Sequence, residues 1–440
     1  MKRQKEYKSY MVFALLALVF LLIYSFSTSP IYPYAYGWDS DFFRLVGEGM
    51  LKGYIPYRDF FDMKGPWLFF LECIGQMICI GKTGAFIIQY IHLFLVLIVC
   101  YKINSKYWDQ KTVMGNLIAF VPMFIIYAAT MEGGNLTEDL GLLYLFVPLY
   151  FSLDFIKNDR EEHRPIYALI YGSCFGILAQ IRLTNSVLIC AIVLTILIEL
   201  IKKKKWNNIL LNMLYFIAGV VIVFIPTLLY FGYYGEIESM FYCTFVFGFI
   251  YAVGDMAFGA GKLLVLTLFL TPIVLYLTGE KNKKFWILIL SNIVGMLAIL
   301  SMGIGNMHDY MLILPGVMLG IWELLANWKN VKCSKIIVLA IVVICFLYPT
   351  YKLAGATKNL IFDKQDSSCW ECVQETVKYI PEEERDSVWG FVVPVWWYTM
   401  AEIMPCNKYL AWQERYMELS DNIKNEIYNM MDTEPPTWIV

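Results

Sequence analysis

The chain has 440 residues, of which 59% are hydrophobic and 16% are charged, and its mean hydropathy is +0.57. This composition excludes an ordinary soluble globular protein and predicts a protein embedded in a lipid bilayer. The formal net charge of -2 offers no positive field for nucleic acid, so we expect no nucleic-acid partner.

Long apolar segments recur along the first four fifths of the chain. A helix needs roughly 17–25 apolar residues to cross the hydrocarbon core of a bilayer. By this criterion we predict eleven transmembrane helices, at 11–29, 84–101, 113–130, 138–156, 166–181, 185–201, 208–230, 262–278, 285–302, 310–326 and 336–352. The chain is therefore expected to be an all-α polytopic membrane protein.

The apolar run 66–80 is only about fifteen residues long, and whether it crosses decides the orientation of everything after it. Lys and Arg in short loops stay on the cytoplasmic side. If 66–80 does not cross, the basic N-terminus, the run Lys202 to Lys205 and the other basic loops all fall on one side. We therefore predict a juxtamembrane or re-entrant helix at 66–80 on the outer side.

This topology predicts two domains. Residues 1–352 form the transmembrane domain, with a first outer loop at 30–83, and residues 353–440 form a small extracytoplasmic domain. In the tail, SVWGFVVPVWWY is typical of a strand, ELSDNIKNEIYNMM of an amphipathic helix, and TWIV of a second strand. We expect an α/β fold there.

The first outer loop concentrates the charges Asp39, Asp41, Arg44, Glu48, Lys52, Arg58, Asp59, Asp62 and Lys64. Glu48 and Lys52 are typical of an exposed helix face. Asp39 and Lys64 are expected near the headgroup plane, since one follows the first span and the other precedes an apolar helix through a Gly-Pro pair. A carboxylate there can accept a proton from a hydroxyl nucleophile, and a lysine can stabilise a phosphate leaving group.

Three other outer positions carry polar groups. Arg182 interrupts an apolar run, where an unpaired charge is costly, and its anionic partner is either a structural carboxylate or a lipid phosphate. The stretch MEGGNLTED supplies Glu132, Asn135 and Glu138 as substrate-binding candidates, with helix capping by Asn135 or Thr137 as the structural alternative. His308 begins a span, where a lone histidine is more often a satisfied interfacial residue than a ligand.

These motifs resemble the bacterial GT-C glycosyltransferases, relatives of the protein O-mannosyltransferases and of the aminoarabinose transferase of lipid A. The resemblance rests on the D-S-x-x-F-x-x-x-G pattern beginning at Asp39, GYIPYRDFFDMKGP at 53–66, R-L-T-N at 182–185, H-D-Y-x-x-x-x-P at 308–315, and the end of the tail. It implies a GT-C-like fold, with Asp39 as general base and Lys64 beside the donor phosphate. Ser40 and Asp41 follow where many relatives have Asp-Glu, so either aspartate could be the base.

The resemblance further implies donor-phosphate contacts from Arg182, His308 and Tyr310, and substrate contacts from Arg58, Asp59 and Asp62. The expected function is inverting transfer of a sugar from a polyprenyl-phosphate donor to an envelope lipid, glycan or protein, at the outer face of a bacterial plasma membrane. We expect no bound cofactor and assign no metal. The alternatives are a transporter or flippase of lipid-linked saccharides, which would place charges near the bilayer midplane, and a non-catalytic scaffold.

Overall fold

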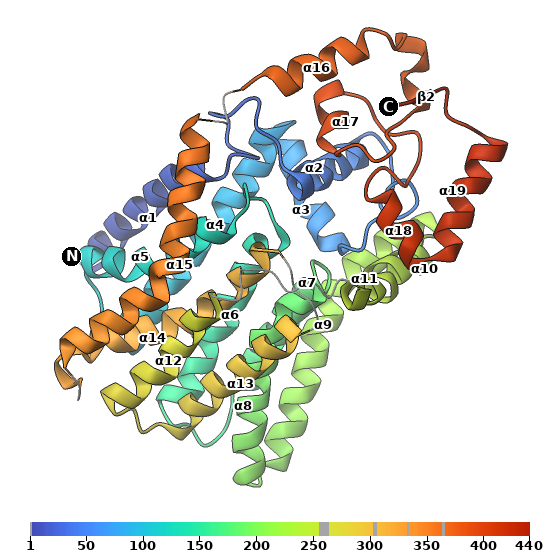
Figure 1. Ribbon diagram of the computed structural model, residues 1–440. Helices are drawn as coiled ribbons and strands as arrows, with labels where there is room; N and C mark the ends of the chain where they lie inside the picture. Colours follow the sequence, from blue (N-terminus) through green and yellow to red (C-terminus); the bar gives the residue numbers. More distant parts are fainter. Residues whose placement is uncertain (1, 255–263, 302–305, 332–333, 363–365) are drawn as a thin grey trace.

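The computed structural model describes residues 2–254, 264–301, 306–331, 334–362 and 366–440 (Figure 1). Long helices form a bundle, and short helices and loops from the two ends of the sequence gather at one end of it. We call this the loop end, because it carries α2 (Trp38–Leu51), α3 (Pro66–Ile78) and the tail after residue 366. The hairpin between α8 and α9 lies at the opposite end.

Eight helices within the described residues are long and apolar enough to cross a membrane. They are α1 (Lys2–Tyr24), α4 (Lys82–Tyr107), α5 (Val113–Thr130), α6 (Thr137–Lys157), α8 (Val187–Lys202) with the 3-10 turn η1 (Leu183–Ser186), α9 (Trp206–Tyr234), α14 (Leu314–Ala326) with the 3-10 turn η4 (His308–Ile313), and α15 (Lys335–Phe362). Each corresponds to a predicted span.

The other three predicted spans are also helices. They are α7 (Pro165–Ala179), α12 (Val265–Thr278) and α13 (Lys283–Ser301), which pack against α9, α14 and α8, respectively. The predicted boundaries at 262 and 302 lie outside the described residues. The all-α polytopic membrane fold is thus confirmed, although α7 and α12 are shorter than a full crossing.

The outer surface of the bundle is apolar. In the 18-residue apolar stretch of each helix, only 17% of α9 and 22% of α15 is buried inside the protein. Leu229 of α9 and Ile336 of α15 are among the exposed side chains. A soluble protein rarely exposes apolar surface on this scale, whereas lipid tails would cover it. The buried side of the bundle packs around large side chains such as Phe13, Tyr127 and Trp322.

Helix α3, which covers the run expected not to cross, has 13 residues and is therefore about 20 Å long. This is shorter than the hydrocarbon core of roughly 30 Å. It packs against α2 at Gly47, where an added Cβ would lie 2.7 Å from the Cβ of Glu72. The two short helices therefore form one unit at the loop end.

The tail is compact but differs from the expected α/β pattern. It contains α16 (Ser368–Val377), η6 (Glu382–Ser387), β1 (Val388–Trp389), α17 (Trp396–Ala401), α18 (Gln413–Leu419), α19 (Asp421–Thr433) and β2 (Trp438–Ile439). Strand β1 pairs in parallel with β2, with Val388 opposite Trp438. The amphipathic helix and the C-terminal strand are confirmed.

The strand predicted over SVWGFVVPVWWY is wrong beyond its first residues. Strand β1 ends at Trp389, and α17 begins at Trp396, two residues after Pro394. Proline has no N–H for a sheet ladder, so the apolar residues around it are buried by a turn and a helix instead. Helix α15 also continues to Phe362, so the predicted boundary at 352 falls inside a helix.

The tail packs directly on the first loop. The ring of Phe61 lies 5.1 Å from those of Tyr409 and Tyr416, and the ring of Phe42 lies 5.6 Å from that of Trp412. The backbone N–H of Phe61 donates to the carbonyl of Lys408 at 2.9 Å. Because both share one hydrophobic cluster, the tail supports the loop that carries the candidate site.

A third segment completes this cluster. It consists of α10 (Ile237–Phe241), the π-helical turn η2 (Tyr242–Phe247) and α11 (Gly248–Gly254). The rings of Phe247 and Phe61 lie 4.9 Å apart, and Thr244 Oγ1 lies 3.2 Å from the Tyr57 hydroxyl. The remaining 3-10 turn, η5 (Trp328–Asn330), follows α14.

Candidate functional site

Asp39 and Asp41 both lie in the first turn of α2 but differ in their surroundings. Asp41 is 1% exposed, pairs with Arg44, and accepts hydrogen bonds from the N–H of Gly37 at 2.7 Å and the hydroxyl of Thr399 at 3.1 Å. Asp39 is half-buried and makes no hydrogen bond or ion pair with any described residue. Asp41 therefore fastens the start of α2 to the tail, whereas the carboxylate of Asp39 is free.

Lys64 is held at this site by the Gly-Pro pair that follows it. The N–H of Gly65 donates to the carbonyl of Ile181 at 3.0 Å, and an added Cβ on Gly65 would lie 2.1 Å from the carbonyl oxygen of Gln180. Only glycine permits this approach. The contact brings the segment with Lys64 beside the segment with Arg182, although the two are far apart in sequence.

The Lys64 ammonium lies 5.8 Å from the centre of the Phe43 ring and forms no ion pair with a described carboxylate. Burial lowers the pKa of Lys64, but the charges of Asp39 and Asp62 outweigh burial and raise it above its ordinary value. Lys64 is therefore a cation with no anion in direct contact.

Asp62 completes this group. Its side chain is fully buried; one carboxyl oxygen accepts the N–H of Met63 at 2.7 Å, and the other has no partner among the described residues. Burial raises the pKa of Asp62 to about 6, against the influence of Lys64. We call Asp39, Asp62 and Lys64 the aspartate–lysine cluster, because their charges act on one another.

Arg182 is paired by two carboxylates from different helices. Its Nη1 lies 2.9 Å from Glu138 Oε1 and 2.5 Å from Asp309 Oδ1. Both acids are almost completely buried. Burial lowers the pKa of Arg182, but the two acids raise it above its ordinary value. Of the two partners left open by the sequence, the structural carboxylate is present, and Arg182 also acts on Lys64 electrostatically.

His308 is satisfied by Glu132, whose Oε2 lies 2.5 Å from its Nδ1 and also accepts its backbone N–H at 3.3 Å. Its Nε2 lies 4.0 Å from Glu138 Oε2, and the charge of Asp39 acts on it. Tyr310, by contrast, is 2% exposed and packs in the hydrophobic core of the bundle. The structure therefore brings His308 and Glu132 to the site but not Tyr310.

Glu138, His308 and Asp309 each offer one ligand atom within 4.8 Å of the others, a spacing that could hold a metal ion. Arg182 occupies Glu138 Oε1 and Asp309 Oδ1, whereas Glu138 Oε2 and Asp309 Oδ2 have no hydrogen-bond partner among the described residues. The expectation of no bound cofactor stays a prediction, and we assign no metal to these residues.

The turn before α6 lies against the start of α2. Gly133 and Gly134 have φ values of +103° and +86°, and an added Cβ on Gly134 would lie 2.1 Å from Ser25 Oγ. Asn135, buried at φ +60°, donates from Nδ2 to Ser40 Oγ at 3.3 Å. The structural alternative, capping of the helix by Asn135 or Thr137, is not what the structure shows, since the N-cap residue is Leu136 and no side chain of the described residues caps the helix.

Two acids near the site were not selected from the sequence. Asp309 was not among the predicted site residues, although it lies between His308 and Tyr310, which were. In the structure it is a partner of Arg182. Glu72 is fully buried on α3, where burial raises its pKa to about 7 against the influence of Asn135 and Arg44. A carboxylate within the apolar run 66–80 was the available signal.

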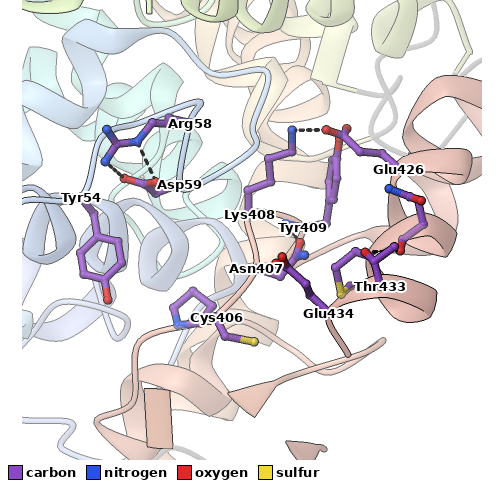
Figure 2. A pocket seen from close by; sticks show the side chains of 13 residues that line it. Tyr54, Arg58, Asp59, Cys406, Asn407, Lys408, Tyr409, Glu426, Thr433 and Glu434 are labelled. Carbon is purple, nitrogen blue, oxygen red and sulfur yellow. Dashed lines mark hydrogen bonds and ion pairs between the residues drawn. The ribbon is translucent and has the colours of Figure 1, made fainter. Parts of the chain in front are cut away.

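Arg58 and Asp59 lie elsewhere on the loop. They bind each other at 2.8 and 2.9 Å and line a cavity of about 470 Å³ between the first loop and the tail (Figure 2). Glu48 and Lys52 form an i,i+4 ion pair at 2.8 Å, with 26% and 49% of their side chains exposed, so their expected surface position is confirmed.

Comparison with known proteins shows a likeness to a solved membrane-protein structure. No protein-family model and no curated protein sequence matches the chain. Among solved structures, it is similar to ArnT from Cupriavidus metallidurans bound to undecaprenyl phosphate, with a TM-score of 0.61 and 11% sequence identity over 90% of this chain and 85% of that chain. At this identity the likeness establishes the fold alone. The chain therefore has the polytopic membrane fold of that protein.

Proposed function

We propose that this protein is a membrane glycosyltransferase that moves a sugar from a polyprenyl-phosphate donor to an extracytoplasmic lipid, glycan or protein acceptor. The observation that carries the proposal is the aspartate–lysine cluster, in which, among the described residues, Asp39 has no hydrogen-bond or ion-pair partner and Lys64 contacts no anion. In a structural ion pair, the carboxylate and the ammonium would lie in direct contact. Open groups of opposite charge are what a substrate with a hydroxyl and a phosphate requires.

Asp39 serves as the general base in this proposal. It takes the proton of the acceptor hydroxyl while that oxygen forms a bond to the anomeric carbon of the donor. The bond from this carbon to the phosphate oxygen breaks on the opposite side, and its electron pair leaves with the polyprenyl phosphate. This direct displacement inverts the anomeric centre.

Lys64 stabilises the charge that develops on the leaving phosphate. Arg182 acts on Lys64 electrostatically, and Glu138 and Asp309 fix the position of its guanidinium. Asp41 is assigned a positioning role instead of the base, since its oxygens are already occupied by Gly37, Arg44 and Thr399. The choice between the two aspartates thus favours Asp39.

The likeness to ArnT, whose structure contains undecaprenyl phosphate, supports a polyprenyl phosphate as the carrier of the sugar. The orientation we propose is a bacterial plasma membrane with the loop end outside. Lys202 to Lys205 lie between α8 and α9, at the opposite end from α2 (Figure 1), which fits the positive-inside rule.

A transporter or flippase is the less favoured function. Such proteins place charged sites near the bilayer midplane. In the described part of the eleven bundle helices, Asp, Glu, Lys and Arg other than Lys352 of α15 lie near helix ends, as do Glu138 and Lys157 in α6.

The test compares Asp39→Asn with the matched variant Glu48→Gln, a partly exposed carboxylate on the same helix that pairs with Lys52. Membranes containing each variant receive radiolabelled polyprenyl-phosphate sugars, and transfer to membrane acceptors is measured. We expect Asp39→Asn to lower transfer by about 100-fold or more, and Lys64→Met to do so as well, with expression unchanged. Glu48→Gln should transfer normally. Wild-type transfer by Asp39→Asn would refute the role of Asp39.

A further inference from the structure

The cavity between the first loop and the tail is a second candidate site (Figure 2). One side is formed by Tyr54, Arg58 and Asp59 of the loop. The other side comes from the tail and is lined by Pro405, Cys406, Asn407, Lys408, Tyr409, Glu426, Asn429, Met430, Thr433 and Glu434. Its volume of about 470 Å³ is within the range of roughly 300–1,000 Å³ that is typical of small-molecule sites.

The charges of the cavity do not suit an anionic ligand. Its two cations are already paired, Arg58 with Asp59 at 2.8 Å and Lys408 with Glu426 at 2.8 Å. Glu434 adds a third carboxylate to the lining, so the side chains carry a net negative charge. A phosphate would be repelled, and the cavity is therefore unsuited to the donor headgroup.

The remaining lining groups suit a neutral ligand rich in hydroxyl groups. The amide nitrogen of Asn407 and the side-chain amide of Asn429 make no hydrogen bond with any described residue, and both side chains line the cavity. Tyr54 lines the loop side, where its ring can pack on an apolar face of a ligand. Amide groups that both donate and accept, next to an aromatic ring, match the alternating hydroxyl and C–H faces of a sugar.

A backbone hydrogen bond also connects the lining of the cavity with the segment that leads to the aspartate–lysine cluster. Lys408, which lines the cavity, accepts the N–H of Phe61 through its carbonyl, and Phe61 directly precedes Asp62. A chain of sugars held in the cavity therefore lies beside the segment that carries the proposed catalytic groups.

From this arrangement we infer that the cavity is a subsite for an uncharged saccharide of the acceptor, so that the acceptor is a glycan. The assignment of the saccharide to the acceptor rests on the proposed function, whereas the binding of a neutral saccharide does not. The bound sugars would hold the acceptor glycan while its terminal hydroxyl reaches Asp39.

Binding is tested on the full chain in lipid nanodiscs by saturation-transfer NMR. The probes are neutral methyl glycosides and disaccharides of hexoses, pentoses and N-acetylhexosamines, with glucuronic acid and a serine-rich peptide as comparisons. We expect a neutral saccharide to bind, and Asn429→Ala and Asn407→Ala each to weaken it about three- to tenfold. The matched variant Asn425→Ala, on the same helix but outside the cavity, should bind normally.

Asp39→Asn keeps this inference separate from the proposed function, because it should bind the saccharide normally while transfer is lost. The inference is overturned if no neutral saccharide binds the wild-type chain, if only the acidic sugar or the peptide binds, or if Asn407→Ala and Asn429→Ala bind like Asn425→Ala. Normal transfer by Asp39→Asn with intact saccharide binding would overturn the proposed function alone.

Discussion

Replacing Arg182 by methionine should destabilise the protein strongly, because the change leaves two buried acids without their cation. Glu138 is fully buried and Asp309 is 2% exposed, and both accept hydrogen bonds from Arg182 Nη1. Removing one partner from a buried ion pair costs about 3–5 kcal/mol. Since 27% of the Arg182 side chain is exposed and water can enter its place, we expect the lower part of this range.

The free energy of unfolding is measured by denaturant titration in lipid nanodiscs, with Arg58→Met as the matched control. The Arg58 side chain is 46% exposed and pairs only with neighbouring Asp59, so its loss should cost about 0–1 kcal/mol. Adding Glu138→Gln and Asp309→Asn to Arg182→Met should restore much of the stability, because no buried charge then remains unpaired. Equal stabilities of Arg182→Met and Arg58→Met would refute this reasoning.

Three further predictions concern Asp62, the tail and the orientation. Burial raises the pKa of Asp62 to about 6, so the Asp62 carboxyl group binds a proton more tightly in the folded protein than in the unfolded chain. This protonation stabilises the folded protein fully at low pH, and the stabilisation is lost as pH rises through 6. Thermal unfolding measured from pH 4 to 7 should therefore show Asp62→Asn gaining stability relative to the wild type as pH increases, and a constant difference would contradict this. Trp389→Ala removes a buried ring whose N–H donates to the carbonyl of Tyr409 at 2.8 Å, so it should cost about 3–5 kcal/mol and make the tail sensitive to protease, while the exposed control Tyr379→Ala should not. In a chain whose exposed native cysteines are replaced by serine, Lys52→Cys should react with an impermeant maleimide outside the cell and Lys204→Cys only after lysis; labelling of both from one side would overturn the orientation.

The membrane helices were predictable from sequence because the signal is local. A segment that crosses a bilayer must be apolar along its whole length and satisfy its own backbone hydrogen bonds, so residues such as those of α5 (Val113–Thr130) reveal their state without their neighbours. The short helix α3 was predictable for the same reason, since the length of its apolar run is visible in the sequence. That α3 does not cross the membrane stays a prediction.

The tail shows where local signals fail. The residues around Trp389 and Trp396 have the composition of a strand, but Pro394 and burial against the first loop divide them into a two-residue strand and a helix. Strand propensity chiefly reflects packing against neighbours, and here those neighbours include α2, which lies more than 300 residues away in the sequence.

The sequence by itself determined which residue types stand at the loop end, because a charge beside a membrane span is costly and therefore informative. Only the tertiary structure decided their states: Asp41 is bound, Asp39 has no partner among the described residues, Arg182 is held by Glu138 and Asp309, and Tyr310 is packed in the core. The physical reason is that a charge's partner depends on distances between side chains of different helices, which helix packing sets and which residue spacing along one chain does not contain.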